Sequence, residues 1–187
     1  MITFKRRKED VLGKEDKSSI GEIDEKIKKL CDIINKKEEY YTLSSCSGRV
    51  VLIRNIDKKQ PGLFFFVSHD KIKLPELKKQ LDNAEKKKES LIFKQESFIL
   101  HVACKTLEDA DVFLKKVQEI GMKHSGIINI GEKRIIIEVI ESSQLAFPIT
   151  ERGKILVNDD FLKILVSESD KRLEKSWEKI EKLGKIL

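Results

Sequence analysis

Residues 98–140 read FILHVACKTLEDADVFLKKVQEIGMKHSGIINIGEKRIIIEVI, and their apolar residues indicate the fold class most clearly. Their apolar periodicity predicts a strand, a helix and two more strands, over Phe98–Cys104, Thr106–Ile120, Ser125–Ile130 and Arg134–Ile140. Thr106 and Asp109 form a helix cap, and Gly121 ends the helix. One strand, one helix and two strands do not alternate as a doubly wound parallel sheet requires. The order therefore predicts an α+β fold.

The segments on either side fit the same fold class. We expect further helices over residues 20–37, 74–84 and 158–183, and further strands at 40–43, 49–54, 63–67, 144–148 and 154–157. No G-x-G-x-x-G follows a predicted strand, which disfavours a Rossmann methyltransferase or dehydrogenase. We therefore expect one domain over residues 1–187, with a large mixed β-sheet flanked by about four helices.

The composition excludes several classes of protein. Of the 187 residues, 37% are charged and 40% are hydrophobic. The longest apolar runs are far shorter than the roughly 20 residues that a membrane-spanning helix needs, and the N-terminus lacks the apolar core of a signal peptide. The 3 cysteines are widely spaced and odd in number, which favours a reducing compartment over a disulfide scaffold. We expect a cytoplasmic globular protein.

The positive charge is concentrated in the middle of the chain. The net charge is +6, and residues 41–94 alone hold 12 basic and 6 acidic residues. A local cationic surface is the electrostatic signature of a protein that binds a polyanion such as nucleic acid. A solvated lysine-rich face, as in thermophilic proteins, is the alternative interpretation. The charge pattern leaves both open.

The run SSCSGR at residues 44–49 is the first candidate for a functional site. We expect it in a loop between two strands, where small side chains leave backbone N–H groups approachable and Gly48 permits unusual dihedral angles. Arg49 can bind a carboxylate or a phosphate through a bidentate fork. Cys46 is a candidate nucleophile, although no His or Asn is near it in the sequence. The alternative is an ordinary polar turn, which has the same composition.

Two histidines are further candidates. His69 follows a predicted strand at the point where the strand gives way to a loop, and Asp70 is next to it. His101 shares one strand face with Ile99 and Ala103, so it is either functional or a core residue with satisfied hydrogen bonds. The cysteines and histidines are scattered and include no C-x-x-C pair. We therefore expect no metal site.

The longest match to a known family lies around the first candidate site. The run Tyr41-Thr42-Leu43-Ser44-Ser45-Cys46-Ser47-Gly48-Arg49 resembles the tRNA wybutosine-synthesizing protein 3 family. Further matches are Asp16-Lys17-Ser18, Val67-Ser68-His69-Asp70, Phe98-Ile99-Leu100-His101-Val102, Leu107-Glu108-Asp109-Ala110, Ser125-Gly126 and Lys133-Arg134. The resemblance extends from near Phe4 to the final helix, so it covers nearly the whole chain.

This resemblance implies a specific reaction. It implies S-adenosylmethionine-dependent methylation of N4 on the 7-aminocarboxypropyl-demethylwyosine base at position 37 of phenylalanine tRNA, in wybutosine biosynthesis. It also implies one domain that does not have the Rossmann fold. Two alternative functions from other functional classes stay open. One is a non-catalytic tRNA-binding module that assists a modification complex, and the other is a hydrolase that uses Cys46.

The resemblance and the chemistry of the residues together assign roles. The candidate catalytic residues are His69, Asp70 and Cys46. The candidate residues for the methyl donor are Ser44, Ser45, Ser47, Gly48, Arg49, His101, Ser125 and Gly126. The candidate residues for tRNA are Arg49, Arg54, Lys58, Lys59, Lys86, Lys87 and Lys88. Arg49 suits the carboxylate of the donor or that of the aminocarboxypropyl tail, and the lysines suit tRNA phosphates.

Overall fold

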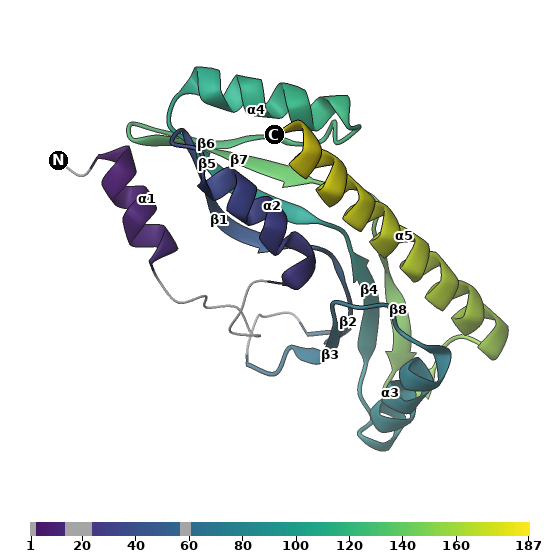
Figure 1. The fold of residues 1–187 in the computed structure, drawn as a ribbon. Helices are drawn as coiled ribbons and strands as arrows, with labels where there is room; N and C mark the ends of the chain where they lie inside the picture. Colours follow the sequence, from purple (N-terminus) through teal and green to yellow (C-terminus); the bar gives the residue numbers. More distant parts are fainter. Residues whose placement is uncertain (1–2, 14–23, 57–60) are drawn as a thin grey trace. The chain divides into compact units, whose positions relative to one another are not determined.

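The chain divides into two compact units. The computed structural model describes residues 3–13, 24–56 and 61–187, which form helices α1–α5 and strands β1–β9 (Figure 1). Unit 1 contains Met1–Ser47, Phe98–Ser142 and Ser176–Leu187, and unit 2 contains Gly48–Ser97 and Ser143–Lys175. Each unit is built around its own sheet.

Unit 1 contains a four-stranded sheet in the order β1-β5-β7-β6. Its strands are β1 (Tyr40–Cys46), β5 (Ile99–Cys104), β7 (Arg134–Ile140) and β6 (Gly126–Gly131). Every neighbouring pair is antiparallel. Ser44 lies opposite His101, and His101 lies opposite Glu138. Gly126 lies opposite Glu138, so one residue from each strand belongs to a single row across the sheet.

The core of unit 1 lies on one face of this sheet. It is covered by α2 (Glu25–Asn35), α4 (Leu107–Glu119) and the last turns of α5 (Asp159–Ile186). On α2 the buried residues recur at spacings of three and four, which places Ile27, Leu30 and Ile34 against the sheet. Helix α1 (Phe4–Leu12) packs against β1, where the rings of Phe4 and Tyr41 are 5.1 Å apart.

Unit 2 contains a five-stranded antiparallel sheet in the order β3-β2-β4-β8-β9. Its strands are β2 (Arg49–Arg54), β3 (Phe64–Ser68), β4 (Leu91–Glu96), β8 (Leu145–Glu151) and β9 (Lys154–Ile155), and its helices are α3 (Leu74–Lys86) and the first turns of α5. Along β4, the buried Phe93 and Gln95 alternate with half-buried Lys94 and Glu96. Arg49 lies opposite Glu96 and therefore on the same, more exposed face.

The α+β class is confirmed, and neither sheet has the parallel, doubly wound topology. The strands form two antiparallel sheets where we expected one large mixed sheet. Short links favour antiparallel partners and join β6 to β7 and β8 to β9. The consecutive strands β1 and β2, and likewise β4 and β5, instead belong to different sheets. The described residues form five helices where we expected about four. The additional helix is α1, which has no buried residue and only three apolar residues, Phe4, Val11 and Leu12. The expectation of one domain over residues 1–187 stays a prediction.

The expected loop at residues 44–49 is wrong for its first half. Strand β1 continues to Cys46, and β2 begins at Arg49, so only Ser47 and Gly48 link the two strands. Ser44 and Cys46 therefore belong to the ladder with β5. We based the loop on its small polar residues and on Gly48, a composition typical of turns, and pairing with β5 overrides this signal. Because successive N–H groups of an extended strand point to opposite sides, this part of β1 does not form an anion cradle.

Candidate active site

Ser44, His101 and Glu138 form a hydrogen-bonded chain that we call the Ser44 row. Ser44 Oγ lies 2.7 Å from Nδ1 of His101, and Nε2 of His101 lies 2.9 Å from Oε2 of Glu138. The Ser44 side chain is exposed, and the side chains of His101 and Glu138 are 29% and 31% exposed. A ligand on this face of the sheet can therefore reach the row.

The contacts of the Ser44 row determine which ring nitrogen of His101 carries the hydrogen. An ionised carboxylate only accepts hydrogen bonds, so Nε2 of His101 carries the hydrogen that points to Glu138. In a neutral imidazole, Nδ1 is then the acceptor, and the hydroxyl of Ser44 donates to it. This assignment follows from the network of contacts. The result is a basic nitrogen that faces an exposed hydroxyl.

Arg49 and Glu96 form an ion pair in unit 2 that we call the Arg49 pair. Nε of Arg49 donates to Oε2 of Glu96 over 2.6 Å, and the two side chains are 25% and 32% exposed. The Arg49 guanidinium carbon also lies 5.0 Å from the centroid of the Phe64 ring, within the range of a cation–π contact. An accessible guanidinium beside a carboxylate matches a ligand that carries a carboxylate and an ammonium group.

Ser47 binds a carboxylate of the protein itself, that of Asp24. The Ser47 amide donates to Oδ2 of Asp24 over 3.3 Å, and the Ser47 hydroxyl donates to the same oxygen. Asp24 also caps α2 by accepting from the Lys26 amide. Gly48 has a φ of 106°, which glycine adopts without the steric strain that other residues incur. The expected cradle therefore joins β1 to the start of α2.

Ser45 lies against the core of unit 1, and Cys46 ends β1. Ser45 hydrogen-bonds to the buried thiol of Cys31, and burial is the larger effect, so the pKa of Cys31 is raised to about 11. Burial likewise raises the pKa of Cys104 to about 12. Cys46 is half-buried at the end of β1. Ser45 therefore faces the core, on the opposite side of the strand from Ser44.

Ser125 and Gly126 lie beside the Ser44 row. The buried hydroxyl of Ser125 accepts from the Ile140 amide over 3.1 Å, so it joins the start of β6 to the end of β7. Gly126 ends the row opposite Glu138, and it adds no side chain there. The structure thus brings together Ser44, His101 and Gly126, which the sequence predicted separately.

His69 and Asp70 lie in a bend that follows β3. Ser68 stabilises this bend because its hydroxyl donates to the Asp70 carbonyl over 3.0 Å and accepts from the Asp70 amide over 3.2 Å. His69 is half-buried and Asp70 is exposed. Their predicted role in catalysis stays a prediction.

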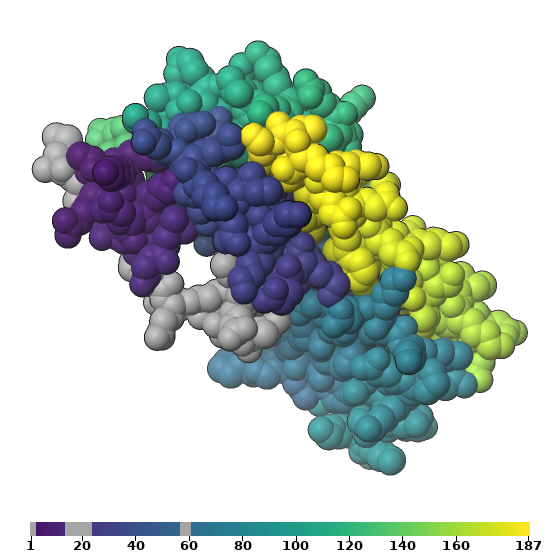
Figure 2. Space-filling view, viewed as in Figure 1, coloured from purple at the N-terminus to yellow at the C-terminus, as the bar shows by residue number. Residues whose placement is uncertain are grey.

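The predicted tRNA-binding residues divide into two groups. Lys86, Lys87 and Lys88 are exposed at the end of α3, whose segment forms part of the visible surface in Figure 2. Arg54 donates to Glu89 from Nε and Nη2, over 3.0 and 2.9 Å, and from Nη1 to the Gly62 carbonyl, so its guanidinium bonds within unit 2. Lys58 and Lys59 lie outside the described residues.

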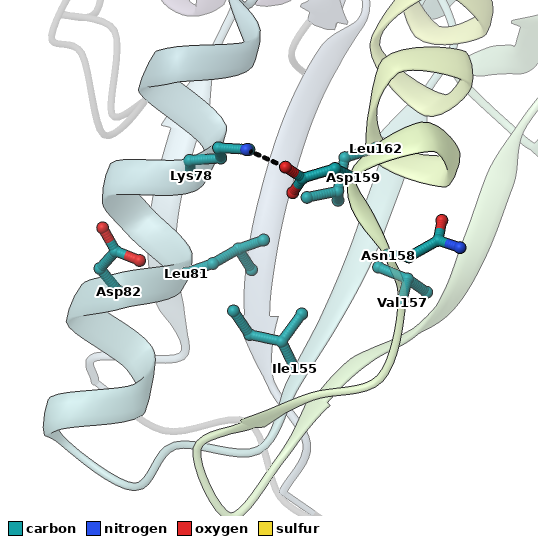
Figure 3. A pocket seen from close by; sticks show the side chains of 8 residues that line it. All are labelled: Lys78, Leu81, Asp82, Ile155, Val157, Asn158, Asp159 and Leu162. Carbon is teal, nitrogen blue, oxygen red and sulfur yellow. Dashed lines mark hydrogen bonds and ion pairs between the residues drawn. The ribbon is translucent and has the colours of Figure 1, made fainter.

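A separate pocket of about 250 Å³ lies in unit 2, between α3 and the start of α5. Figure 3 shows its apolar floor and the ion pair between Lys78 and Asp159 at its edge. No predicted site residue lines it. Within 3–13, 24–56 and 61–187, no group of three metal-binding side chains is found and no helix is long and apolar enough to span a membrane.

The family described as Methyltransferase TYW3 matches residues 6–187. The chain belongs to the TYW3 methyltransferase family. This match confirms the resemblance seen in the sequence. TYW3 family membership also implies that the protein binds a methyl donor, because a methyltransferase needs one.

Individual TYW3 relatives cover most of the chain. The "tRNA wybutosine-synthesizing protein 3 homolog" of Xenopus laevis is 34% identical over 98% of this chain and 74% of its own length. The "tRNA(Phe) 7-((3-amino-3-carboxypropyl)-4-demethylwyosine(37)-N(4))-methyltransferase" of Methanocaldococcus jannaschii is 35% identical over 84% of this chain and 82% of its own. The structure of the PH1069 protein from Pyrococcus horikoshii has a TM-score of 0.84 and 29% identity, and the match covers 98% of this chain and 95% of that chain.

Three acidic residues that belong to these clusters were not predicted from the sequence. They are Glu138 in the Ser44 row, Glu96 in the Arg49 pair and Asp24 beneath Ser47. Glu138 did leave a signal, because it is the one charged residue inside the apolar run from Ile135 to Ile140. A charge at that position of a sheet requires a partner. Asp24 left no comparable signal, since it is one of many acidic residues near an expected helix.

Proposed function

We propose that this protein transfers a methyl group from S-adenosylmethionine to N4 of the 7-(3-amino-3-carboxypropyl)-4-demethylwyosine base at position 37 of phenylalanine tRNA. The observation that carries this proposal is the 35% identity to the Methanocaldococcus jannaschii relative, whose name states this nucleobase, position and atom. The sulfonium of S-adenosylmethionine supplies an activated methyl group. The cysteine pattern of the sequence supports a reducing compartment, and we place the reaction in the cytoplasm.

The Arg49 pair fits the polar end of both reactants. The methionine part of the donor and the aminocarboxypropyl tail of the base each carry an α-ammonium and an α-carboxylate group. Arg49 would bind the carboxylate in a fork, and Glu96 would accept from the ammonium group. The ring of Phe64 beneath Arg49 holds the guanidinium in place. The residues present therefore suit such a group, whichever reactant supplies it.

The exposed lysines at the end of α3 suit the tRNA backbone. Lys86, Lys87 and Lys88 are consecutive and exposed. Each lysine that neutralises a phosphate releases a counterion, and this release favours binding at low salt. Arg54 bonds to Glu89 instead, so we assign it to holding β2 against the segment that precedes β4 rather than to tRNA.

The experiment is a single-turnover methylation assay with purified phenylalanine tRNA that carries or lacks the aminocarboxypropyl tail. We expect methylated base only when S-adenosylmethionine is present. Arg49→Ala removes the carboxylate partner, and one unpaired group costs about 1–3 kcal/mol, or roughly 5–150-fold in rate or affinity. If Arg49 binds the tail, tail-less tRNA reacts slowly with the wild-type protein. If Arg49 binds the donor, Arg49→Ala instead raises the dissociation constant of S-adenosylmethionine in calorimetry.

The matched control is Arg152→Ala, which removes an exposed arginine of the same unit and should leave rate and affinity unchanged. Wild-type protein that binds tRNA without methylating it would favour a non-catalytic tRNA-binding module. Wild-type behaviour of Arg49→Ala in both assays would remove the Arg49 pair from the site.

A further inference from the structure

Methylation of N4 requires a proton acceptor, and the Ser44 row has the form of one. We propose that the N4 proton of the base passes to the hydroxyl of Ser44 while the hydroxyl hydrogen passes to Nδ1 of His101, and that Glu138 positions the imidazole. This inference rests on the proposed function. It goes beyond it by naming the acceptor and by giving Ser44 and His101 a role in catalysis, where the sequence predicted donor binding.

The proton balance of the reaction calls for such a group. The N4–carbon bond forms as the methyl–sulfur bond breaks, and the electron pair of the broken bond stays on sulfur, which becomes a neutral thioether. N4 begins with one hydrogen and ends with the methyl group, so one proton must leave. His101 takes this proton and becomes an imidazolium, which later releases it to water. No other reactant is needed.

The geometry of the Ser44 row suits this transfer. The contact of 2.7 Å between Ser44 Oγ and His101 Nδ1 is within the range for proton transfer along a hydrogen bond. Ser44 is the exposed member of the row, so it is the atom that a base can reach. The three residues of the row lie opposite one another on three neighbouring strands. The strand register therefore fixes their side chains, and no loop takes part.

Glu138 acts through His101. Its 2.9 Å contact with Nε2 selects the tautomer in which Nδ1 is basic, and its charge stabilises the imidazolium that forms. A carboxylate in this position would have little effect once the histidine is absent. Glu138 is therefore a positioning residue, and its substitution should have no further effect when His101 is already replaced.

The test measures single-turnover methylation and S-adenosylmethionine affinity in matched variants. His101→Asn and Ser44→Ala should each lower the methylation rate by about 10²–10⁴-fold, the usual contribution of a general base, with unchanged donor affinity in calorimetry. Ser44→Thr retains the hydroxyl and should retain most of the rate. Imidazole added to His101→Gly should restore part of the rate. The controls are His124→Asn and Glu132→Gln, which replace exposed residues of unit 1.

The double variant tests the role of Glu138. Glu138→Gln alone should be slow, and His101→Asn with Glu138→Gln should be no slower than His101→Asn, because residues that act as a unit are not additive. A wild-type rate in His101→Asn or in Ser44→Ala would overturn the proposal. So would a loss of donor affinity that accounts for the slow rate, since these residues would then be donor ligands. A wild-type protein that never methylates tRNA would instead overturn the proposed function.

Discussion

Among single residues, the three cysteines differ in how far their thiols are buried. Burial raises the pKa of Cys31 to about 11 and that of Cys104 to about 12, whereas a cysteine in an unfolded chain has a pKa of about 8.5. Both thiols therefore keep their hydrogen in the folded protein at pH 8. Only the thiolate reacts readily with electrophiles, so these two cysteines are protected by protonation as well as by burial.

We expect one alkylation event at pH 8 in the folded protein. Cys46 is half-buried at the end of its strand and should react with iodoacetamide, while Cys31 and Cys104 should react only near pH 11–12 or after unfolding. Mass spectrometry of the intact protein counts the adducts, and digestion locates them. Protein unfolded in urea should show three adducts. Rapid labelling of Cys104 in native protein would contradict the burial described above.

The candidate site was predicted in part. The sequence predicted Ser44, His101 and Gly126 as separate candidate residues, and the sheet register aligns them. The partner of His101 was not predictable, because Glu138 is 37 residues away and only the pairing of β5 with β7 makes them neighbours. The loop interpretation was wrong at Ser45, whose inward direction follows from strand alternation once β1 is known to reach Cys46.

At the scale of elements, the turn between β8 and β9 rests on the end of α3. Arg152 and Gly153 have φ values of 49° and 85°, as a two-residue hairpin turn requires. A Cβ atom on Gly153 would lie 2.8 Å from the Glu85 carbonyl oxygen, closer than real Cβ contacts. The Gly153 amide also donates to the Glu89 carbonyl over 2.9 Å. Position 153 therefore has no room for a side chain.

Gly153→Ala should destabilise the protein more than Gly121→Ala. Gly121 has a similar φ of 82°, but a Cβ atom there would meet nothing within 4 Å. Both variants incur the backbone cost of a left-handed alanine, about 1–2 kcal/mol. Gly153→Ala adds the cost of overpacking, about 1–3 kcal/mol. Urea unfolding of both variants measures the difference, and equal free energies of unfolding would show that the turn moves away from α3.

Elements with strong local signals were predicted well. The capping box of α4 is confirmed, since the Thr106 hydroxyl accepts from the Asp109 amide over 3.1 Å and the Asp109 carboxylate accepts in return. The end of β1 was mistaken because the small polar residues from Ser44 to Gly48 have the composition of a turn. Pairing with β5 overrides that signal.

At the scale of the whole molecule, the chain passes between the two units four times, at 47/48, 97/98, 142/143 and 175/176. The last passage lies within α5. No change of composition marks these passages, because the first three are short links between consecutive strands and the last is the interior of a helix. The division into two sheets was therefore not predictable, although nearly every strand was. We propose that the two units nevertheless fold as one domain.

If the two units fold as one domain, the protein should unfold in one cooperative transition. Trp177, the single tryptophan, reports on unit 1. The variant Trp177→Phe/Phe161→Trp moves the reporter into unit 2, where residue 161 packs against Phe147. In urea, tryptophan fluorescence and circular dichroism should give the same midpoint within each protein. A fluorescence midpoint that departs from the circular dichroism midpoint in either protein would show that the units unfold separately.

Because segments of unit 1 and unit 2 alternate along the sequence, recombination between related genes cannot easily exchange a whole unit. A single crossover between two related genes at any point within residues 48–175 leaves both units with segments from two parents. Replacing unit 2 as an intact block needs four crossovers, one at each passage. Segments that pack together must then diverge together, because a partner inherited from another lineage brings side chains of the wrong volume into a close-packed core. Chimeric proteins built at one junction should therefore lose stability in unit 1 wherever the junction is placed.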